Sequence, residues 1–311
     1  MPAAGVAPRG VPCYTDYIIY IPTARFGPGK ELCMFPCYNM ATTLKSSPLE
    51  KDVALAAAAG FRHIELRKEK LLDYLRRGNS LRSLRQLLEE NGLRPICINA
   101  LPDISFHTGQ ARTAVEELCH FLCYAGQYVG CRDLEVIAAF NAPTDDREAV
   151  TAETAGVLTD LARIAADYHM RLALEYMGLP KNSVRTFDHA LEIVNRVGLV
   201  NVGLLPDTWH HFAGGSQPED LLKARADQIF TVHISDAPDK APLTLRRAEC
   251  IWPGDGVVPI GTMLRCLRKI GYDDIASIEV FDPDIQAMDP EKCIPLAYKR
   301  ATEAIRSADV G

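Results

Sequence analysis

Four side chains suited to binding a metal ion stand at the ends of four successive apolar runs. Glu175 closes RLALE, Asp207 closes VGLLPD, His233 closes IFTVH and Glu279 closes IASIE. Carboxylate oxygens and an imidazole nitrogen together suit Mn²⁺, and also Zn²⁺, Co²⁺ or Mg²⁺. The sequence therefore predicts one divalent metal ion bound by these four residues, with Mn²⁺ as the first expectation.

Each of these residues has a plainer explanation when it is taken alone. A single acidic residue after a strand is usually a helix cap or a solvated loop residue, which would account for Asp207 or Glu279. A single histidine at the end of an apolar run, such as His233, is usually a hydrogen-bonded core residue. The metal hypothesis depends on the repetition of the pattern over four consecutive segments.

The segments that carry these residues alternate between two kinds of pattern from residue 30 onward. Apolar runs of strand length are followed by amphipathic segments of helical period, several of which end in glycine, as at Gly60, Gly92 and Gly130. Eight such repeats predict an α/β fold, a (β/α)₈ TIM barrel formed as a single domain by residues 30–311. The predicted strands are 32–38, 63–66, 95–101, 133–138, 171–175, 202–206, 229–233 and 275–280, and helical segments include 49–60, 81–92, 114–130 and 154–168.

A barrel of this kind explains why the four residues would meet. The carboxyl ends of its strands surround one mouth, where such barrels keep their chemistry. The segment 236–261 between the last two of these residues is rich in Pro and Gly and predicts a long loop at that mouth. No Gly-x-Gly-x-x-Gly motif follows the first strand, so no dinucleotide cofactor is expected.

The composition limits the possible partners. The net charge is −6 and the pI is about 5.8, which argues against nucleic acid, because that partner requires a basic face. No run reaches the roughly 20 apolar residues that span a bilayer. The ten cysteines lie partly inside apolar runs, which indicates reduced thiols and a cytoplasmic protein. Residues 1–29 are rich in Pro and Gly and are expected to form a flexible or oligomer-contacting N-terminal extension.

Several longer motifs resemble one known family. The runs LALEYMG, NVGLLPDTWHHF, VHISD, WPGDG and SIEVF, with CYNMATTL near the start and INALPD after the third strand, are similar to the xylose isomerase-like sugar isomerase and epimerase superfamily. The resemblance covers about residues 30–306 and is strongest to the inosose isomerases. It implies the same barrel and the same four metal ligands.

The resemblance also implies further site residues. Glu175 and Glu279 would shuttle a carbon-bound proton, and His210 would contact substrate oxygens. Arg246 or Arg247 would supply a guanidinium to the substrate. The chain departs from the family pattern at Cys250, where an arginine is expected, and at Met40, where the inosose isomerases would have an acidic residue.

Other residues near the predicted mouth are weaker candidates. Asn99 and Trp252 are predicted to line the substrate pocket, and Glu65 either lines it or forms a surface ion pair with Arg62 or Arg67. Asp236 either orients the imidazole of His233 or caps the following loop. His211, next to His210, is expected to be structural.

The resemblance, together with these residues, implies a metal-dependent isomerase or epimerase of a small keto-polyol or keto-sugar, similar to an inosose. Removal of a proton next to a ketone would give a metal-stabilised enediolate, and the two glutamates would return the proton. A lyase that begins with the same proton removal is the main alternative, either an inosose dehydratase or the catalytic subunit of a C-glycoside-cleaving enzyme. A homo-oligomer is expected in either case, and the C-glycoside alternative would add a partner subunit. A phosphodiesterase and a non-catalytic sugar-binding protein are less favoured.

Overall fold

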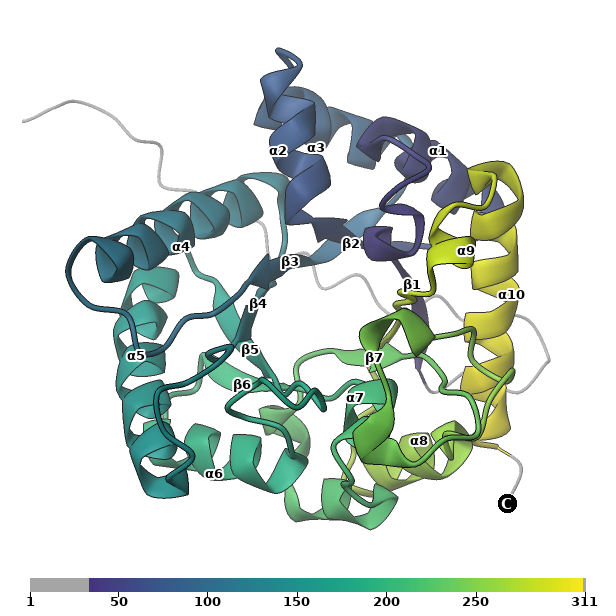
Figure 1. The fold of residues 1–311 in the computed structure, drawn as a ribbon. Helices are drawn as coiled ribbons and strands as arrows, with labels where there is room; N and C mark the ends of the chain where they lie inside the picture. The colour runs from purple at the N-terminus through teal and green to yellow at the C-terminus, as the bar shows by residue number, and fades with distance from the viewer. Residues whose placement is uncertain (1–33, 310–311) are drawn as a thin grey trace, which may run out of the picture. The chain divides into compact units, whose positions relative to one another are not determined.

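The computed structural model describes residues 34–309, and within them eight parallel strands form one sheet that closes into a barrel (Figure 1). Seven adjacent pairs share regular ladders in the order β6-β5-β4-β3-β2-β1-β8-β7. The remaining contact, between β6 and β7, consists of the isolated parallel bridges Leu204–Ile229 and Asp207–His233. The strands are β1 (Phe35–Asn39), β2 (His63–Arg67), β3 (Arg94–Leu101), β4 (Asp133–Ile137), β5 (Arg171–Glu175), β6 (Val202–Leu205), β7 (Val232–Ile234) and β8 (Ile275–Ile278).

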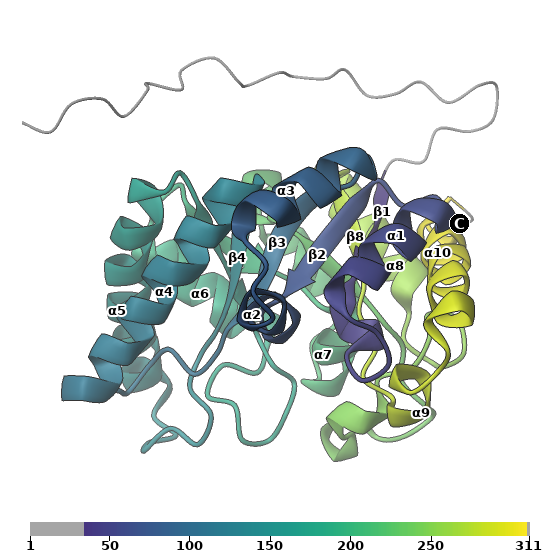
Figure 2. The same cartoon turned by 90° about the horizontal axis from the view of Figure 1, so that it is seen from above.

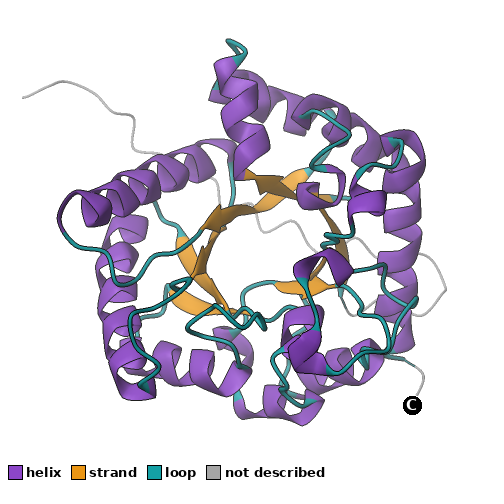
Figure 3. Ribbon diagram, in the orientation of Figure 1, coloured by secondary structure: helices purple, strands orange, loops and turns teal. Residues whose placement is uncertain are grey.

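Helices surround the strands on the outside of the barrel (Figure 3). The α-helices are α1 (Leu49–Ala59), α2 (Lys68–Arg76), α3 (Leu81–Glu90), α4 (Gly109–Val129), α5 (Arg147–Asp167), α6 (Phe187–Val197), α7 (Thr208–Ala213), α8 (Ile260–Lys269), α9 (Pro283–Gln286) and α10 (Pro290–Ser307). Short 3₁₀ helices are η1 (Met40–Thr43), η2 (Pro218–Lys223), η3 (Ala226–Gln228), η4 (Pro242–Thr244) and η5 (Arg247–Glu249). Both α7, which follows β6, and α9, which follows β8, lie at the end of the barrel toward which the arrow of β2 points (Figure 2). The predicted TIM barrel is confirmed.

Local sequence signals account for the predicted helix ends. Helix α1 ends before Gly60 and α4 ends before Gly130, and both glycines have positive φ angles, of 110° and 90°. Glycine adopts this left-handed conformation without a Cβ clash, so it stops a helix at low cost. Helix α3 follows its N-cap residue, Ser80, whose hydroxyl accepts a hydrogen bond from the backbone N–H of Ser83.

The two faces of the strands differ in chemistry because side chains alternate along a strand. Residues such as Tyr38, Ile64 and Leu174 belong to the large apolar core that also contains the inner faces of the helices. The alternate residues along each strand face the barrel axis. Near the amino ends, Cys37, Ile96, Cys97 and Ile275 form a separate apolar cluster. Near the carboxyl ends the inner face is polar, which places charged groups in the barrel mouth.

Three other expectations concern the whole chain. The extension predicted for residues 1–29 lies outside the described residues. Eight cysteines are described, and all of them are free and buried. No helix among the described residues combines the length and apolarity needed to cross a membrane.

Candidate metal centre

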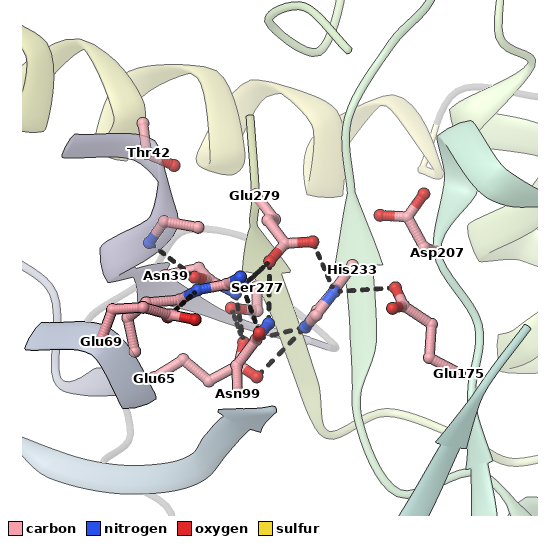
Figure 4. Close-up of polar contacts among 12 residues, drawn as sticks. Asn39, Thr42, Glu65, Glu69, Asn99, Glu175, Asp207, His233, Ser277 and Glu279 are labelled. Carbon is pink, nitrogen blue, oxygen red and sulfur yellow. Dashed lines mark hydrogen bonds and ion pairs between the residues drawn. The ribbon is translucent and has the colours of Figure 1, made fainter. Parts of the chain in front are cut away.

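The structure brings the four predicted metal ligands together at the barrel mouth (Figure 4). Glu175 is the last residue of β5, Asp207 precedes α7, His233 lies in β7 and Glu279 directly follows β8. One ligand atom from each residue lies within 4.8 Å of the other three, and all four side chains are buried. The carboxyl ends of all the parallel strands surround one mouth of the barrel, so residues far apart in sequence meet there.

Two atoms in this group lack hydrogen-bond partners. They show whether the four residues suit a cation, because a bound cation would satisfy such atoms. Oε1 of Glu175 and Nδ1 of His233 are both buried and unpartnered. Nδ1 of His233 lies 3.2 Å from Oε2 of Glu279 and 3.6 Å from Oε1 of Glu175. Buried polar atoms are normally satisfied, and a cation bound between these donors would satisfy both. The residues present therefore fit a divalent metal ion.

Asp207 contributes to the local fold as well as to the cluster. It caps α7, with Oδ1 accepting a hydrogen bond of 2.7 Å from the backbone N–H of His210, and Ser235 donates to Oδ2 at 3.4 Å. Burial, followed by the negative charge of Glu175, raises the pKa of Asp207 to about 8. A cation in the cluster would oppose this rise by stabilising the carboxylate.

Glu279 lies against a network of donors from the opposite side of the mouth. Its Oε1 accepts hydrogen bonds from the side-chain amides of Asn99, at 2.8 Å, and Asn39, at 3.2 Å. A guanidinium nitrogen of Arg67 lies 3.5 Å from the same oxygen. Burial alone would raise the pKa of Glu279, but the charge and contact of His233 and the charge of Arg67 lower it to about 2. Glu279 is thus held as a carboxylate.

The second ring nitrogen of His233, Nε2, contacts the carboxylate of Glu65. Nε2 of His233 lies 3.1 Å from Oε1 and 3.0 Å from Oε2 of Glu65, whose side chain is fully buried. The alternative of a surface ion pair with Arg62 or Arg67 is therefore wrong. Burial alone would lower the pKa of His233, but the carboxylates of Glu65 and Glu279 raise it well above its ordinary value. The contact predicted between Glu65 and the substrate stays a prediction.

Asp236 has the second of its two predicted roles. Its carboxylate accepts hydrogen bonds from the backbone N–H groups of Ala237, Gly254, Gly256 and Val258, at 2.8–3.1 Å. The hypothesis that it orients His233 is wrong, because its oxygens are directed at the loop. Gly256 is required there, since an added Cβ would lie 2.6 Å from Oδ1 of Asp236 and 2.1 Å from a backbone oxygen.

His210 is buried beside the cluster, and its neighbour His211 is structural. The backbone N–H of Gly178 donates to Nδ1 of His210 at 3.2 Å, and burial lowers the pKa of this imidazole to about 4. The ring is therefore neutral, with its proton on Nε2. His211 instead bonds the hydroxyl of Tyr176 at 2.7 Å and the carbonyl of Gln217 at 2.8 Å, as expected for a structural residue.

The long loop separates its two arginines. The guanidinium of Arg247 lies over the ring of Phe281, with 3.7 Å between its Cζ and the ring centroid. Arg246 points outward, with 78% of its side chain exposed, and pairs with Glu249 at 3.4 Å. The structure thus favours Arg247 over Arg246 as a site residue. Trp252 is 5% exposed and belongs to the hydrophobic core, so its predicted substrate contact stays a prediction.

Four inward-facing polar residues were missed by the sequence interpretation as parts of the site: Asn39, Arg67, Glu135 and Ser277. Glu135, on β4, is buried, its side chain makes no hydrogen bond within the described residues, and its Oε2 is an unpartnered buried atom. Burial, followed by the charges of Glu175 and Glu279, raises the pKa of Glu135 well above its ordinary value. The available signal was a polar residue at every second position inside, or directly after, the runs predicted to be buried strands.

Comparison with known proteins agrees with this geometry. A family model described as the xylose isomerase-like TIM barrel matches residues 53–307. The inosose isomerase of Bacillus velezensis is 35% identical over 277 residues, which are 87% of this chain and 96% of that protein. A solved structure of the IOLI protein with a binding zinc atom matches with a TM-score of 0.85 at 31% identity, covering 88% of this chain and 98% of that one.

A more distant relative has a different named activity. The 3-dehydroshikimate dehydratase of Pseudomonas aeruginosa is 27% identical over 252 residues, which are 80% of this chain. The match covers 38% of the dehydratase, so the chain spans well under half of that protein. Both an isomerase and a dehydratase are therefore represented among the chain's relatives.

Proposed function

The chain belongs to the xylose isomerase-like TIM barrel family, and on this premise we propose that it is a divalent-metal-dependent isomerase of an inosose-like keto-polyol. The name and full-length match of the Bacillus velezensis relative support the substrate class. One observation carries the chemistry: four ligand atoms lie within 4.8 Å of one another, and two buried atoms among these residues have no hydrogen-bond partner.

The two glutamates provide the acid and base. A carbon-bound proton next to a ketone is weakly acidic, and a general base positioned by the protein can remove it. The carboxylates of Glu175 and Glu279 lie on either side of the imidazole of His233 (Figure 4), so one can take the proton and the other can return it. A bound divalent cation supplies Lewis acidity that stabilises negative charge on the substrate oxygen.

Two neighbouring side chains support substrate binding. Nδ1 of His210 accepts the backbone N–H of Gly178, so Nε2 carries the ring proton and can donate to a substrate oxygen. The guanidinium of Arg247, fixed over Phe281, adds positive charge near Glu279. Both groups would hold a polyhydroxylated substrate without taking part in proton transfer.

The metal itself is a separate proposal. We propose Mn²⁺ as the native ion, with Zn²⁺ as the competing candidate because the IOLI structure carries a zinc atom. Metal analysis of the purified protein, followed by stripping and reloading with each ion, tests the choice. Highest activity with Mn²⁺ supports the proposal, and highest activity with Zn²⁺ would reverse it.

The decisive experiment follows hydrogen exchange at carbon. Metal-loaded protein is incubated with 2-keto-myo-inositol in D₂O and followed by proton NMR, with metal-stripped protein as the control. Metal-dependent deuterium uptake next to the ketone, together with an isomeric ketone as product, is the expected result. Absence of exchange in the loaded protein would reject this substrate and this reaction.

A lyase is the second candidate, because a dehydratase is among the relatives. Dehydration starts with the same proton removal and then expels a hydroxyl group, so the same glutamates would serve. In the NMR experiment a lyase would give loss of water and a new unsaturated product. Under either function we propose a homo-oligomer, which light scattering on the purified chain tests.

A further inference from the structure

A fully buried carboxylate, Glu65 on β2, lies against the ring nitrogen of His233 that faces away from the other three predicted ligands (Figure 4). We infer that Glu65 is a positioning residue: it holds the proton on Nε2 of His233 and thereby directs the Nδ1 lone pair toward the metal. This inference rests on the proposed function only in taking a divalent cation as the ligand.

The hydrogen bonds around Glu65 determine which atom donates. Its Oε2 accepts from the hydroxyl of Ser277 at 2.6 Å and from the side-chain amide of Asn39 at 3.1 Å. The orientation of that amide is fixed, because the oxygen of Asn39 accepts the backbone N–H of Ala41 at 2.9 Å. Glu65 is therefore surrounded by donors, and the remaining contact requires Nε2–H of His233 to donate to it.

This arrangement leaves one role for the other ring nitrogen. With Nε2 donating to Glu65, Nδ1 faces Glu175 and Glu279 and has no hydrogen-bond partner. A metal-binding histidine generally donates its second N–H to a carboxylate or carbonyl, which fixes the ring and increases its basicity. The sequence places the supporting groups on β1, β2 and β8, so the orientation is built into the barrel itself.

Glu135 provides a matched comparison within the same barrel. It is also a buried inward-facing glutamate, and one of its oxygens lies within 4.8 Å of a ligand atom of both Glu65 and His233. It makes no hydrogen bond to the ring. Loss of a nearby carboxylate can therefore be separated from loss of the Glu65–His233 contact by comparing the two positions.

The experiment measures metal affinity by chelator competition on the purified full-length chain, using Mn²⁺ and Zn²⁺ separately. Glu65→Gln removes the charge and replaces one acceptor oxygen with an amide donor, and we expect about 10-fold weaker binding. Glu65→Met removes both acceptors, and we expect about 100-fold weaker binding. Glu135→Gln is expected to stay within about 3-fold of the wild type, because it leaves the His233 contact intact.

Two further measurements separate positioning from a general structural role. The visible absorption of the Co²⁺-loaded protein should change in Glu65→Gln and remain unchanged in Glu135→Gln. Ser277→Ala removes one donor to Glu65 while keeping the carboxylate. This variant is expected to weaken metal binding a few-fold, by about the effect of one hydrogen bond, and it serves if the Glu65 variants do not fold.

The outcomes distinguish this inference from the proposed function. If His233→Ala weakens metal binding but folded Glu65 variants, or Ser277→Ala, bind as the wild type does, the positioning role is wrong and the ligand set stands. If the wild type binds neither metal, or His233→Ala binds as tightly as the wild type, the proposed metal centre is wrong and the inference fails with it. Equal losses in the Glu65 and Glu135 variants would also overturn it, since they would indicate a general charge effect.

Discussion

The two glutamates among the predicted metal ligands are almost equally buried but have very different surroundings. Glu279 is 3% exposed, and its Oε1 accepts two amide hydrogen bonds beside the guanidinium of Arg67. Glu175 is 2% exposed, and its Oε1 has no hydrogen-bond partner. Figure 4 shows the same contrast, with contacts crowded on the side of Asn39 and Asn99 and few on the side of Asp207.

This contrast separates a completed half of the site from an incomplete one. A buried charge without a partner is costly, so the unpartnered oxygen of Glu175, which lies among three other candidate ligands, fits the proposed cation. The β1, β2, β3 and β8 side of the mouth satisfies its own carboxylates with side chains. On the β5 and β6 side, Asp207 accepts hydrogen bonds from His210 and Ser235, whereas Oε1 of Glu175 accepts none. The predictions below test this difference.

The largest expected effect comes from removing either carboxylate. Glu175→Gln and Glu279→Gln should each lower the rate of deuterium exchange next to the ketone by about 10²–10⁴-fold, the usual contribution of a general acid or base. Circular dichroism checks that both variants are folded. Near-normal exchange in either variant would mean that the substituted carboxylate is not part of the proton shuttle. The different surroundings of Glu175 and Glu279 would then have no bearing on proton transfer at that position.

Metal affinity should increase with pH, because two of the predicted ligands, Asp207 and His233, hold protons when no metal is bound. The pKa of Asp207 is raised to about 8, and that of His233 is raised well above its ordinary value. A cation must displace these protons, so affinity should rise between about pH 6 and 8, by up to about tenfold per unit for each proton released. Chelator competition at several pH values measures the slope, and Asp207→Asn should flatten it. A wild-type slope of zero would show that neither group is protonated without metal.

A smaller effect is expected from weakening the completed half. Asn99→Ala removes the 2.8 Å hydrogen bond to Glu279 and leaves every predicted ligand in place. Hydrogen bonds to charged groups contribute about 1.5–3 kcal/mol, so turnover should fall by roughly 10- to 100-fold. Steady-state kinetics on the keto-polyol, with metal content measured in parallel, gives the comparison. Full activity in this variant would show that the network around Glu279 does not orient it for reaction.

The smallest effect concerns stability. Glu135→Met replaces an unpartnered buried carboxyl with an apolar side chain of similar length, and it should stabilise the metal-free protein by about 1–3 kcal/mol. The raised pKa of Glu135 means that its folded form is penalised once the carboxyl ionises. The wild type therefore becomes less stable through this group as pH rises above about 4.5, the ordinary pKa of a glutamate. The stability advantage of the variant should be larger at pH 8 than at pH 5. Thermal unfolding at the two pH values tests the sign of this stability difference. A destabilised variant would show that the carboxyl of Glu135 makes a stabilising interaction.

The sequence was sufficient to predict the barrel and the meeting of four residues at its mouth. All eight strands lie at or next to their predicted positions, because apolar runs bounded by amphipathic helices are a strong periodic signal. The contacts inside the barrel were less accessible. The pairing of Glu65 with His233 joins β2 to β7 across the axis, and no local pattern records such a distance.

The polar interior was missed for a related reason. A run such as DLEVIA was interpreted by its total apolarity, so the inward-facing Glu135 within it was treated as part of a strand and nothing more. Similarly, the separation of Arg246 from Arg247 depends on the 3₁₀ turn η5 and on the ring of Phe281, which lies on a different segment. Adjacent residues with identical chemistry cannot be ranked until the backbone between them is known.

Asp236 has a consequence for how this protein can diversify. Asp236 and Ile251 are joined by a pair of backbone hydrogen bonds, and the Asp236 carboxylate also gathers the turn that follows Ile251. The segment between Asp236 and Ile251 is thus a closed loop, with both of its ends held to the barrel by hydrogen bonds. Because lengthening a closed loop costs little free energy, we expect insertions in its exposed part, residues 238–244, to be tolerated without disturbing the metal ligands. Evolution or a designer can therefore exchange this segment as a module, altering what enters the mouth while the chemistry beneath it stays constant.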